Sequence, residues 1–202
     1  MTRDEVIRTL DLDAPTVARL DAYTALLTKW QARLNLVGPK TLPELWQRHV
    51  LDSGQLYRRL PPNTRTLVDM GSGAGFPGLV LAIMGVPDVT LIEADRRKAV
   101  FLAEAARVVE AKVEIRAERL EATAKTPVDV VTARALAPLA ELLGWAGGFI
   151  GPTTTCLFLK GGQVEHELTD AAAGWMMTVK RYPSLTHPEG TILELTDVRP
   201  VA

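Results

Sequence analysis

The chain has 202 residues, of which 47% are hydrophobic, 23% charged and 5% aromatic. This composition is typical of globular proteins and excludes a disordered chain, a collagen or a coiled coil as a description of the whole. A single cysteine, Cys156, excludes an internal disulfide and a cysteine-rich zinc site, and we expect no metal. The longest apolar run, from Leu79 to Val86, is far shorter than the roughly 20 residues of a membrane-spanning helix. We therefore expect a cytoplasmic protein without a membrane segment.

The net charge of −1 comes from 23 basic and 24 acidic residues and argues against a nucleic-acid binder that relies on bulk charge. The distribution is uneven, because residues 29–65 contain seven Lys or Arg residues and two acidic residues. This segment therefore carries a net charge of +5 and the rest of the chain −6. The asymmetry is compatible with a local basic surface, and equally with ordinary solvated helix faces.

The first sixty residues have the pattern of helices. Apolar residues at spacings of three and four predict an amphipathic helix from Ala14 to Leu34. Thr41 is a good cap for a second helix that runs toward Leu60, and the two prolines at positions 61 and 62 end it. We interpret residues 1–62 as an N-terminal helical extension.

Beyond residue 62, short strands alternate with helices. The predicted strands are residues 66–70, 89–92, 112–116, 128–132, 153–159, 176–182 and 191–195, and the predicted helices are residues 79–84, 98–109, 136–145 and 164–174. Repeated βαβ units of this length predict an α/β fold whose mostly parallel sheet is covered on both faces. Residues 63–202 are thus expected to be one compact unit that binds its ligand at the carboxyl ends of the strands.

A glycine-rich loop, Asp69 to Gly78, follows the first strand and opens a helix. Glycines let the backbone approach a ligand closely, and the first amides of a helix are free donors. Residues 73–78 match the G-x-G-x-x-G fingerprint of dinucleotide-binding proteins, whereas residues 69–75 read Asp-x-Gly-x-Gly-x-Gly, the pattern of S-adenosylmethionine (SAM) enzymes. We favour SAM because that reading uses Asp69, Gly71, Gly73 and Gly75, and we keep a nucleotide-dependent oxidoreductase as the alternative.

Two further positions at strand ends fit a nucleoside. Glu93 follows the loop by about 20 residues, where a carboxylate accepts ribose hydroxyls, although an exposed acid at a strand end is the plain alternative. After the third strand, an adenine ring can lie against Ala117 while Glu118 reaches its edge.

Several separated motifs together carry a family resemblance. They are Lys29-Trp30, Asn35-Leu36, Arg48-His49-Val50-Leu51-Asp52-Ser53, the loop 69–78, Arg97-Lys98, Phe101-Leu102, Arg116-Ala117-Glu118, Asp129-Val130-Val131, Arg134-Ala135 and Lys160-Gly161. With them the chain resembles the glucose-inhibited division protein B (GidB/RsmG) family of small-subunit ribosomal RNA guanine-N7 methyltransferases. The resemblance implies a class I SAM-dependent methyltransferase fold, Rossmann-like with a mostly parallel seven-stranded sheet, behind the N-terminal helical extension.

The resemblance also implies a site and a substrate. It places SAM against Gly71, Phe76, Ala117, Glu118 and Arg134, beside the residues that the loop pattern and the strand ends already indicate. The implied substrate is a guanine of 16S ribosomal RNA in the small subunit, free or within a ribonucleoprotein, and we expect the enzyme to act as a monomer. Near the C-terminus the family often has an Arg-His pair where this chain has residues 189–191, Glu-Gly-Thr, so we interpret the final hairpin as structural.

Guanine N7 carries a free lone pair and no proton, so the implied reaction needs no general base. We expect His49, Arg134 and Lys160 to position the substrate rather than to exchange protons. His49 can instead belong to a structural network. Arg134 can bind the methionyl carboxylate, an acid of the pocket or an RNA phosphate, or it can form a surface salt bridge. Lys160 can likewise touch phosphate.

The remaining residues with notable chemistry receive structural interpretations. We assign Trp30, Trp46 and Trp145 to the core, and Cys156 to a buried, inert position in an apolar strand. Two other functions stay open from the sequence: SAM-dependent methylation of another substrate, and an RNA-binding module of the same fold without activity.

Overall fold

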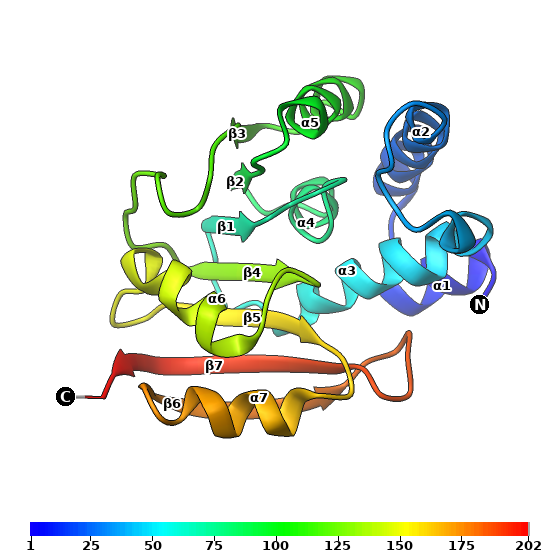
Figure 1. Ribbon diagram of the computed structural model, residues 1–202. Helices are drawn as coiled ribbons and strands as arrows, with labels where there is room; N and C mark the ends of the chain where they lie inside the picture. Colours follow the sequence, from blue (N-terminus) through cyan, green and yellow to red (C-terminus); the bar gives the residue numbers. More distant parts are fainter. Residues whose placement is uncertain (202) are drawn as a thin grey trace.

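A seven-stranded β-sheet runs through the molecule in a computed structural model that describes residues 1–201 (Figure 1). The strands are β1 (Thr66–Met70), β2 (Asp88–Ile92), β3 (Val113–Arg116), β4 (Val130–Arg134), β5 (Thr155–Lys160), β6 (Trp175–Pro183) and β7 (Thr191–Pro200). They lie in the order β3-β2-β1-β4-β5-β7-β6, with β1 to β5 parallel and β7 antiparallel to both neighbours. The predicted class I methyltransferase sheet is thereby confirmed.

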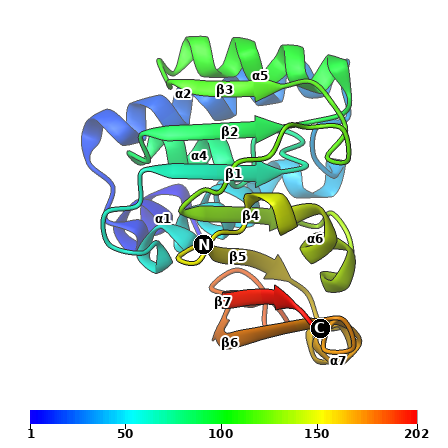
Figure 2. The ribbon, with the colours of Figure 1, turned by 90° about the vertical axis from the view of Figure 1, so that its left-hand side faces the viewer.

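Helices cover both faces of this sheet. One face carries α1 (Arg3–Leu10), α2 (Ala14–Gln31), α4 (Gly78–Ile83) and α5 (Arg96–Val108), and the other carries α6 (Leu139–Ala146), the short η4 (Gly147–Phe149) and α7 (Val164–Ala171) (Figures 1 and 2). No helix within residues 1–201 is both long and apolar enough to cross a membrane.

Neighbouring residues of one strand supply opposite cores. Leu67 of β1 belongs to the core under α2, α4 and α5, and Val68 belongs to the core under α6 and α7. The same alternation holds for Val130 and Val131 of β4, because successive side chains of a strand point to opposite faces. The sheet is therefore buried on both sides, as parallel sheets are.

The order in which successive strands are added to the sheet reverses between β1 and β4. From β1 the chain proceeds outward to β2 and β3, then returns to pair β4 with the other side of β1. The carboxyl ends of β1 and β4 thus form the switch point at which α/β sheets bind ligands. The loop Asp69–Gly78 starts there, and Arg134 is the last residue of β4.

The first helix of the extension was not predicted, although its start has a recognisable signal. Thr2 and Glu5 form a capping box, in which each side chain bonds the backbone of the other residue. This motif is visible in the sequence as Thr-x-x-Glu. The predicted helix from Ala14 is confirmed as α2 and ends at Gln31, three residues earlier than expected.

The prediction of one continuous helix from Thr41 to Leu60 is wrong. The segment consists instead of four short pieces: η1 (Pro39–Glu44), a π-helical η2 (Trp46–Leu51), α3 (Asp52–Gly54) and η3 (Gln55–Arg59). Pro43 lies inside the first piece and interrupts the ladder of amide donors. The widened π turn is a geometry often found at functional sites. Here it contains Arg48 and His49, and Asp52 follows its last residue.

Candidate functional site

Asp69, near the end of β1, holds the glycine loop in place from the interior of the protein. This carboxylate is fully buried, and its oxygens accept hydrogen bonds from the backbone N–H of Gly78 at 3.1 Å and from the hydroxyl of Thr132 at 2.8 Å. Burial raises the pKa of Asp69 to about 6, and these two hydrogen bonds oppose the rise. Asp69 therefore joins β1, β4 and the start of α4.

Three glycines of the loop have backbone angles that other residues rarely adopt. The φ angle is +65° at Gly71, +57° at Gly73 and +100° at Gly75. A Cβ atom on Gly75 would also lie 2.9 Å from Cβ of Leu79. The glycines at these positions are thus required by the turn itself, before any ligand is considered.

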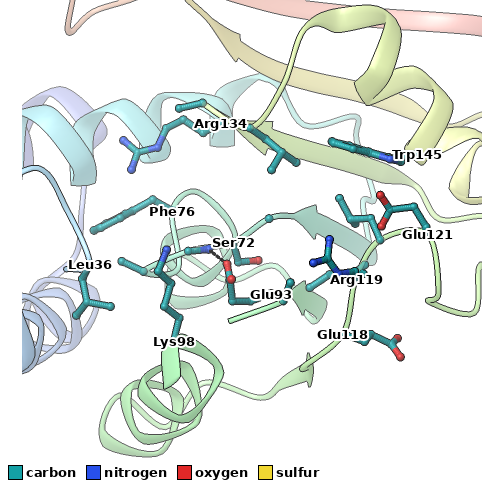
Figure 3. A pocket seen from close by; sticks show the side chains of 18 residues that line it. Leu36, Ser72, Phe76, Glu93, Lys98, Glu118, Arg119, Glu121, Arg134 and Trp145 are labelled. Carbon is teal, nitrogen blue, oxygen red and sulfur yellow. Dashed lines mark hydrogen bonds between the residues drawn. The ribbon is translucent and has the colours of Figure 1, made fainter. Parts of the chain in front are cut away.

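Glu93 holds the other side of the loop. It follows β2 directly and is 8% exposed, with one carboxylate oxygen accepting from the backbone N–H of Gly73 and the other from that of Asp95, each at 2.8 Å. A carboxylate has about four acceptor positions, so two stay available for donors of a ligand. Its side chain lies at the centre of the cavity in Figure 3.

A cavity of about 450 Å³ opens between these groups, and we call it the first cavity. Six residues predicted to bind the cofactor line it: Gly71, Gly73, Phe76, Glu93, Glu118 and Arg134. Three others that were predicted lie outside the lining: Asp69 is buried beneath the loop, Gly75 packs against α4, and Ala117 lies on the exposed surface.

Glu118 has a different orientation from the one expected. Its carboxylate accepts a hydrogen bond from the hydroxyl of Thr123, and in Figure 3 it points away from the middle of the first cavity. The predicted contact with an adenine edge must therefore be made by the backbone of this segment, or the side chain of Glu118 must move.

The lining residues that were not predicted to bind the cofactor include Leu36, Lys98, Arg119 and Trp145 (Figure 3). Trp145 was assigned to the core, and it does pack against the core under α6 and α7, but it is only half-buried and also lines the first cavity. Lys98 had a usable signal, because it belongs to the first turn of the helix that follows Glu93. Leu36 belongs to the Asn35-Leu36 motif of the family resemblance, but that motif was given no role in the cofactor site.

Arg134 lies at the centre of a cluster beside the first cavity. Its Nη1 donates to a carboxylate oxygen of Asp52 at 3.2 Å and to the carbonyl oxygen of Arg48 at 3.3 Å. Its Nη2 lies 3.0 Å from Nδ1 of His49, and its Cζ lies 5.0 Å from the centre of the Phe76 ring. The strand end, the π turn and the glycine loop thus meet at one guanidinium group.

His49 is held as a neutral ring by the same cluster. Because the Arg134 guanidinium can only donate, Nδ1 of His49 is the acceptor and Nε2 donates to the hydroxyl of Thr41 at 2.8 Å. Burial, Arg134 and Arg48 together lower the pKa of His49 from 6.5 to about 3. The ring also stacks on Phe76, with centroids 5.0 Å apart. These contacts favour a positioning residue over an acid or base.

A second cavity of about 390 Å³ lies on the other side of Arg134, which together with Ala135 lines both cavities. Lys160 lines it at the end of β5, but its ammonium group pairs with Glu167 at 2.5 Å and donates to the carbonyl oxygen of Ala137 at 2.8 Å. A contact between Lys160 and phosphate stays a prediction, and the ion pair favours a role in fixing the loop after β4.

The hairpin between β6 and β7 contributes to the second cavity. The hydroxyl of Thr186 donates to Asp52 at 2.6 Å, and Ser184, Thr186 and His187 belong to the wall. The hairpin thus forms part of the wall of the second cavity, and its interpretation as structural stays a prediction.

The basic segment 29–65 does not form one surface. Lys29 lies at the end of α2 and Arg33 just after it, and both are exposed. With Trp30 and Arg97 they line a cavity of about 570 Å³. This cavity lies toward the carboxyl ends of the parallel strands, where the site is. Arg65, in contrast, precedes the first residue of β1 and lies at the opposite edge. Arg65 therefore lies apart from the surface that carries Lys29 and Arg33.

Solved structures with similar folds include a SAM-dependent methyltransferase and a protein in complex with AdoMet. The chain superposes on a TehB-like SAM-dependent methyltransferase from Corynebacterium glutamicum with a TM-score of 0.59 and 14% identity, covering 86% of this chain and 97% of that one. It also matches TYW2 from M. jannaschii, solved in complex with AdoMet, with a TM-score of 0.57 and 14% identity over 74% and 77% of the two chains. At these identities the likeness shows the fold alone.

Sequence relatives are much closer. The chain is 53% identical to the ribosomal RNA small subunit methyltransferase G of Paramagnetospirillum magneticum, over 98% of this chain and 97% of the relative. It is 51% identical to the protein of the same name from Rhodospirillum rubrum, over 98% of each. The model of the GidB family, described as rRNA small subunit methyltransferase G, matches residues 16–193. The predicted family is therefore confirmed, and the chain belongs to the GidB family.

Proposed function

We propose that this chain transfers a methyl group from SAM to N7 of a guanine in 16S ribosomal RNA of the small subunit. Membership of the GidB family makes it a SAM-dependent rRNA methyltransferase. The observation that supports the proposal most directly is Arg134, whose side chain borders the first cavity and the second cavity at once. Such an arrangement brings a cofactor and a substrate together at the switch point of the sheet.

The residues of the first cavity fit a nucleoside cofactor. A Cβ atom added to Gly73 would meet nothing closer than an oxygen at 3.9 Å, so the loop leaves open space beside its backbone. Glu93 lies across from it with free acceptor positions for ribose hydroxyls. We assign Gly71, Gly73, Phe76 and Glu93 to direct contact with the cofactor, and Asp69 and Gly75 to the shape of the loop.

Ala117, Glu118 and Arg134 complete the proposed cofactor site. Ala117 and Glu118 lie just beyond β3, next to lining residues 119–121, where their backbone can meet an adenine edge. Arg134 already bonds Asp52, so we assign its remaining capacity to the methionyl carboxylate or to an RNA phosphate.

SAM supplies the methyl group when it is bound. The lone pair of guanine N7 forms the new bond to the methyl carbon, while the pair of the carbon–sulfur bond leaves with sulfur, so a positive charge passes to guanine. No proton leaves N7, and no residue has to act as a base. The protein contributes orientation and the exclusion of water, which in favourable cases lower a barrier by about 7 to 11 kcal/mol.

His49, Arg134 and Lys160 provide that orientation in our proposal. His49 and Arg134 are locked against each other and against Phe76, so each fixes the other's position at the boundary of the two cavities. Lys160 acts one step further away, because its bond to the Ala137 carbonyl holds the loop that follows Arg134.

The proposed partner is RNA of the small subunit, free or already bound to ribosomal protein, and we propose that a cytoplasmic monomer binds it. Residues 1–62 act as the extension that contacts RNA, and residues 63–202 as the methyltransferase unit. Lys29 and Arg33 support this division, because they belong to the extension and are exposed near the first cavity.

A transfer assay tests the proposed function. Small subunits from cells that lack the enzyme are incubated with the protein and with SAM labelled in its methyl group. We expect label in 16S ribosomal RNA at a single guanine N7. Label at another atom or another molecule, or no incorporation by protein that binds SAM, contradicts the proposal. Titration with SAM and with NAD separates it from the oxidoreductase, which requires binding of NAD.

A further inference from the structure

Within residues 1–201, Arg48 is the charged residue of the second cavity whose side chain forms no ion pair. Of the charged residues that line this cavity within positions 1–201, Arg134 pairs with Asp52 and Lys160 pairs with Glu167. The guanidinium group of Arg48 forms neither a hydrogen bond nor an ion pair within those positions, although its carbonyl oxygen accepts from Arg134. Among residues 1–201, Arg48 is therefore the cationic lining residue of this cavity whose side chain stays unpaired.

The other polar groups around it are already engaged with one another. The hydroxyl of Thr186 donates to Asp52, the hydroxyl of Ser184 bonds that of Thr186 at 2.9 Å, and the hydroxyl of Thr41 bonds His49. Arg48 is half-buried in this wall, and it lies near enough to His49 to disfavour a proton on that ring. Its donors are thus the largest unused binding capacity of the cavity, and they are suited to an anion.

We propose that the second cavity receives the target guanosine nucleotide and that Arg48 binds its backbone phosphate. This inference rests on the proposed function. The volume of about 390 Å³ lies within the range of cavities that hold small ligands, and the cavity meets the first cavity at Arg134 and Ala135. A base seated there has its N7 next to the source of the methyl group.

The charge of the reaction favours phosphate over the base as the partner of Arg48. Methylation leaves a positive charge on the guanine ring, and a guanidinium bonded to the same N7 and O6 edge would raise the energy of that product. A phosphate oxygen carries its negative charge throughout the reaction, and a guanidinium matches its geometry with two parallel bonds. Arg48 thus binds the nucleotide without opposing the chemistry.

The test compares Arg48→Met, Arg48→Lys and, as a matched control, Lys112→Met, which removes an exposed cation just before β3 at the far edge of the sheet. Each protein methylates small subunits from cells that lack the enzyme, over a range of subunit and salt concentrations. We expect Arg48→Met to raise KM for subunits at least tenfold, to leave the Kd for SAM within twofold, and to reduce the slope of log kcat/KM against log salt by about 0.7. Arg48→Lys should restore most of the loss.

A second measurement isolates the phosphate. Guanosine monophosphate and guanosine compete with subunits, and the ratio of their inhibition constants reports the contribution of the phosphate. We expect this ratio to favour the monophosphate in the wild type and to fall to about one in Arg48→Met. An unchanged ratio or an unchanged subunit KM in a folded variant overturns the inference. A wild-type protein that labels no subunit contradicts the proposed function instead.

Discussion

Arg134 and Asp52 are 82 positions apart in the chain and form an ion pair at 3.2 Å, with 18% and 16% of their side chains exposed. Asp52 also accepts hydrogen bonds from Thr186 and from Gln55, so one carboxylate joins the end of β4, the extension and the final hairpin. The extension is therefore attached to the sheet at the boundary of the two cavities. Any ligand that moves Arg134 also acts on the segment proposed to contact RNA.

Removing Arg134 should leave Asp52 as a largely buried charge without its cation. We expect Arg134→Met to lower the free energy of unfolding by about 3 kcal/mol, the low end for breaking a buried ion pair because both side chains are partly exposed, measured by urea denaturation. Asp52→Asn in the Arg134→Met background removes the uncompensated charge and should recover about 1 kcal/mol. Strictly additive losses in the two single variants and the double variant would show that the pair is not coupled.

The neutral state of His49 predicts a pH dependence of stability. Its pKa is about 3 in the folded protein against 6.5 in the unfolded chain, so below pH 6.5 only the unfolded chain takes up a proton. The stability that neutral His49 contributes is complete above pH 6.5 and is lost progressively as the pH falls toward 3. At about 1.4 kcal/mol per pH unit, the wild type should lose about 2 kcal/mol relative to His49→Gln between pH 6.5 and pH 5.

Paired urea titrations of the wild type and His49→Gln at several pH values measure this difference, since other titrating groups contribute equally to both proteins. The same acid range tests the positioning role. If His49 is neutral throughout, the rate of methyl transfer by the folded wild type should not change in a step near pH 6.5. The pH profiles of the wild type and of His49→Gln should then have the same shape. A step of that kind would assign proton transfer to His49 and contradict our proposal.

The sheet and the glycine loop were predictable because their signals are local. The loop reads as a cofactor motif in a single stretch, and the spacing of strands and helices indicates a parallel sheet without knowledge of contacts. The break in the segment 41–60 was not predictable, since its apolar spacing continues through the π turn. The ion pairs of Arg134 and Lys160 were also out of reach, because their partners are placed by tertiary packing.

Glu93 should be the residue whose charge the cofactor site needs most. Glu93→Gln keeps the shape but turns an amide N–H₂ toward the backbone N–H of Gly73 or Asp95, so it loses one internal bond and an acceptor for ribose. We expect the Kd for SAM to rise between tenfold and a hundredfold in calorimetric titrations, as the loss of one or two hydrogen bonds to a charged group implies.

Glu114→Gln is the matched control for this variant, because Glu114 is exposed on β3 and pairs with Arg116 away from the first cavity. Its Kd for SAM should stay within twofold of the wild type. Equal affinities of the wild type and Glu93→Gln would remove Glu93 from the cofactor site and assign it to the support of the glycine loop alone.

The affinity for small subunits should depend on whether a cation of the segment 29–65 lies at the carboxyl or the amino ends of the parallel strands. It should not depend on the total charge. Lys29 and Arg33 lie near the first cavity, while Arg65 lies at the opposite edge. Lys29→Glu combined with Arg33→Glu should weaken binding to small subunits at least tenfold near 0.1 M salt and lower the salt slope by about 1.4, with SAM binding unchanged. Arg65→Glu changes the net charge in the same direction and should leave subunit binding within twofold. Filter binding over a salt series measures both proteins, and an equal loss in Arg65→Glu would mean that bulk charge, rather than a local surface, attracts the RNA.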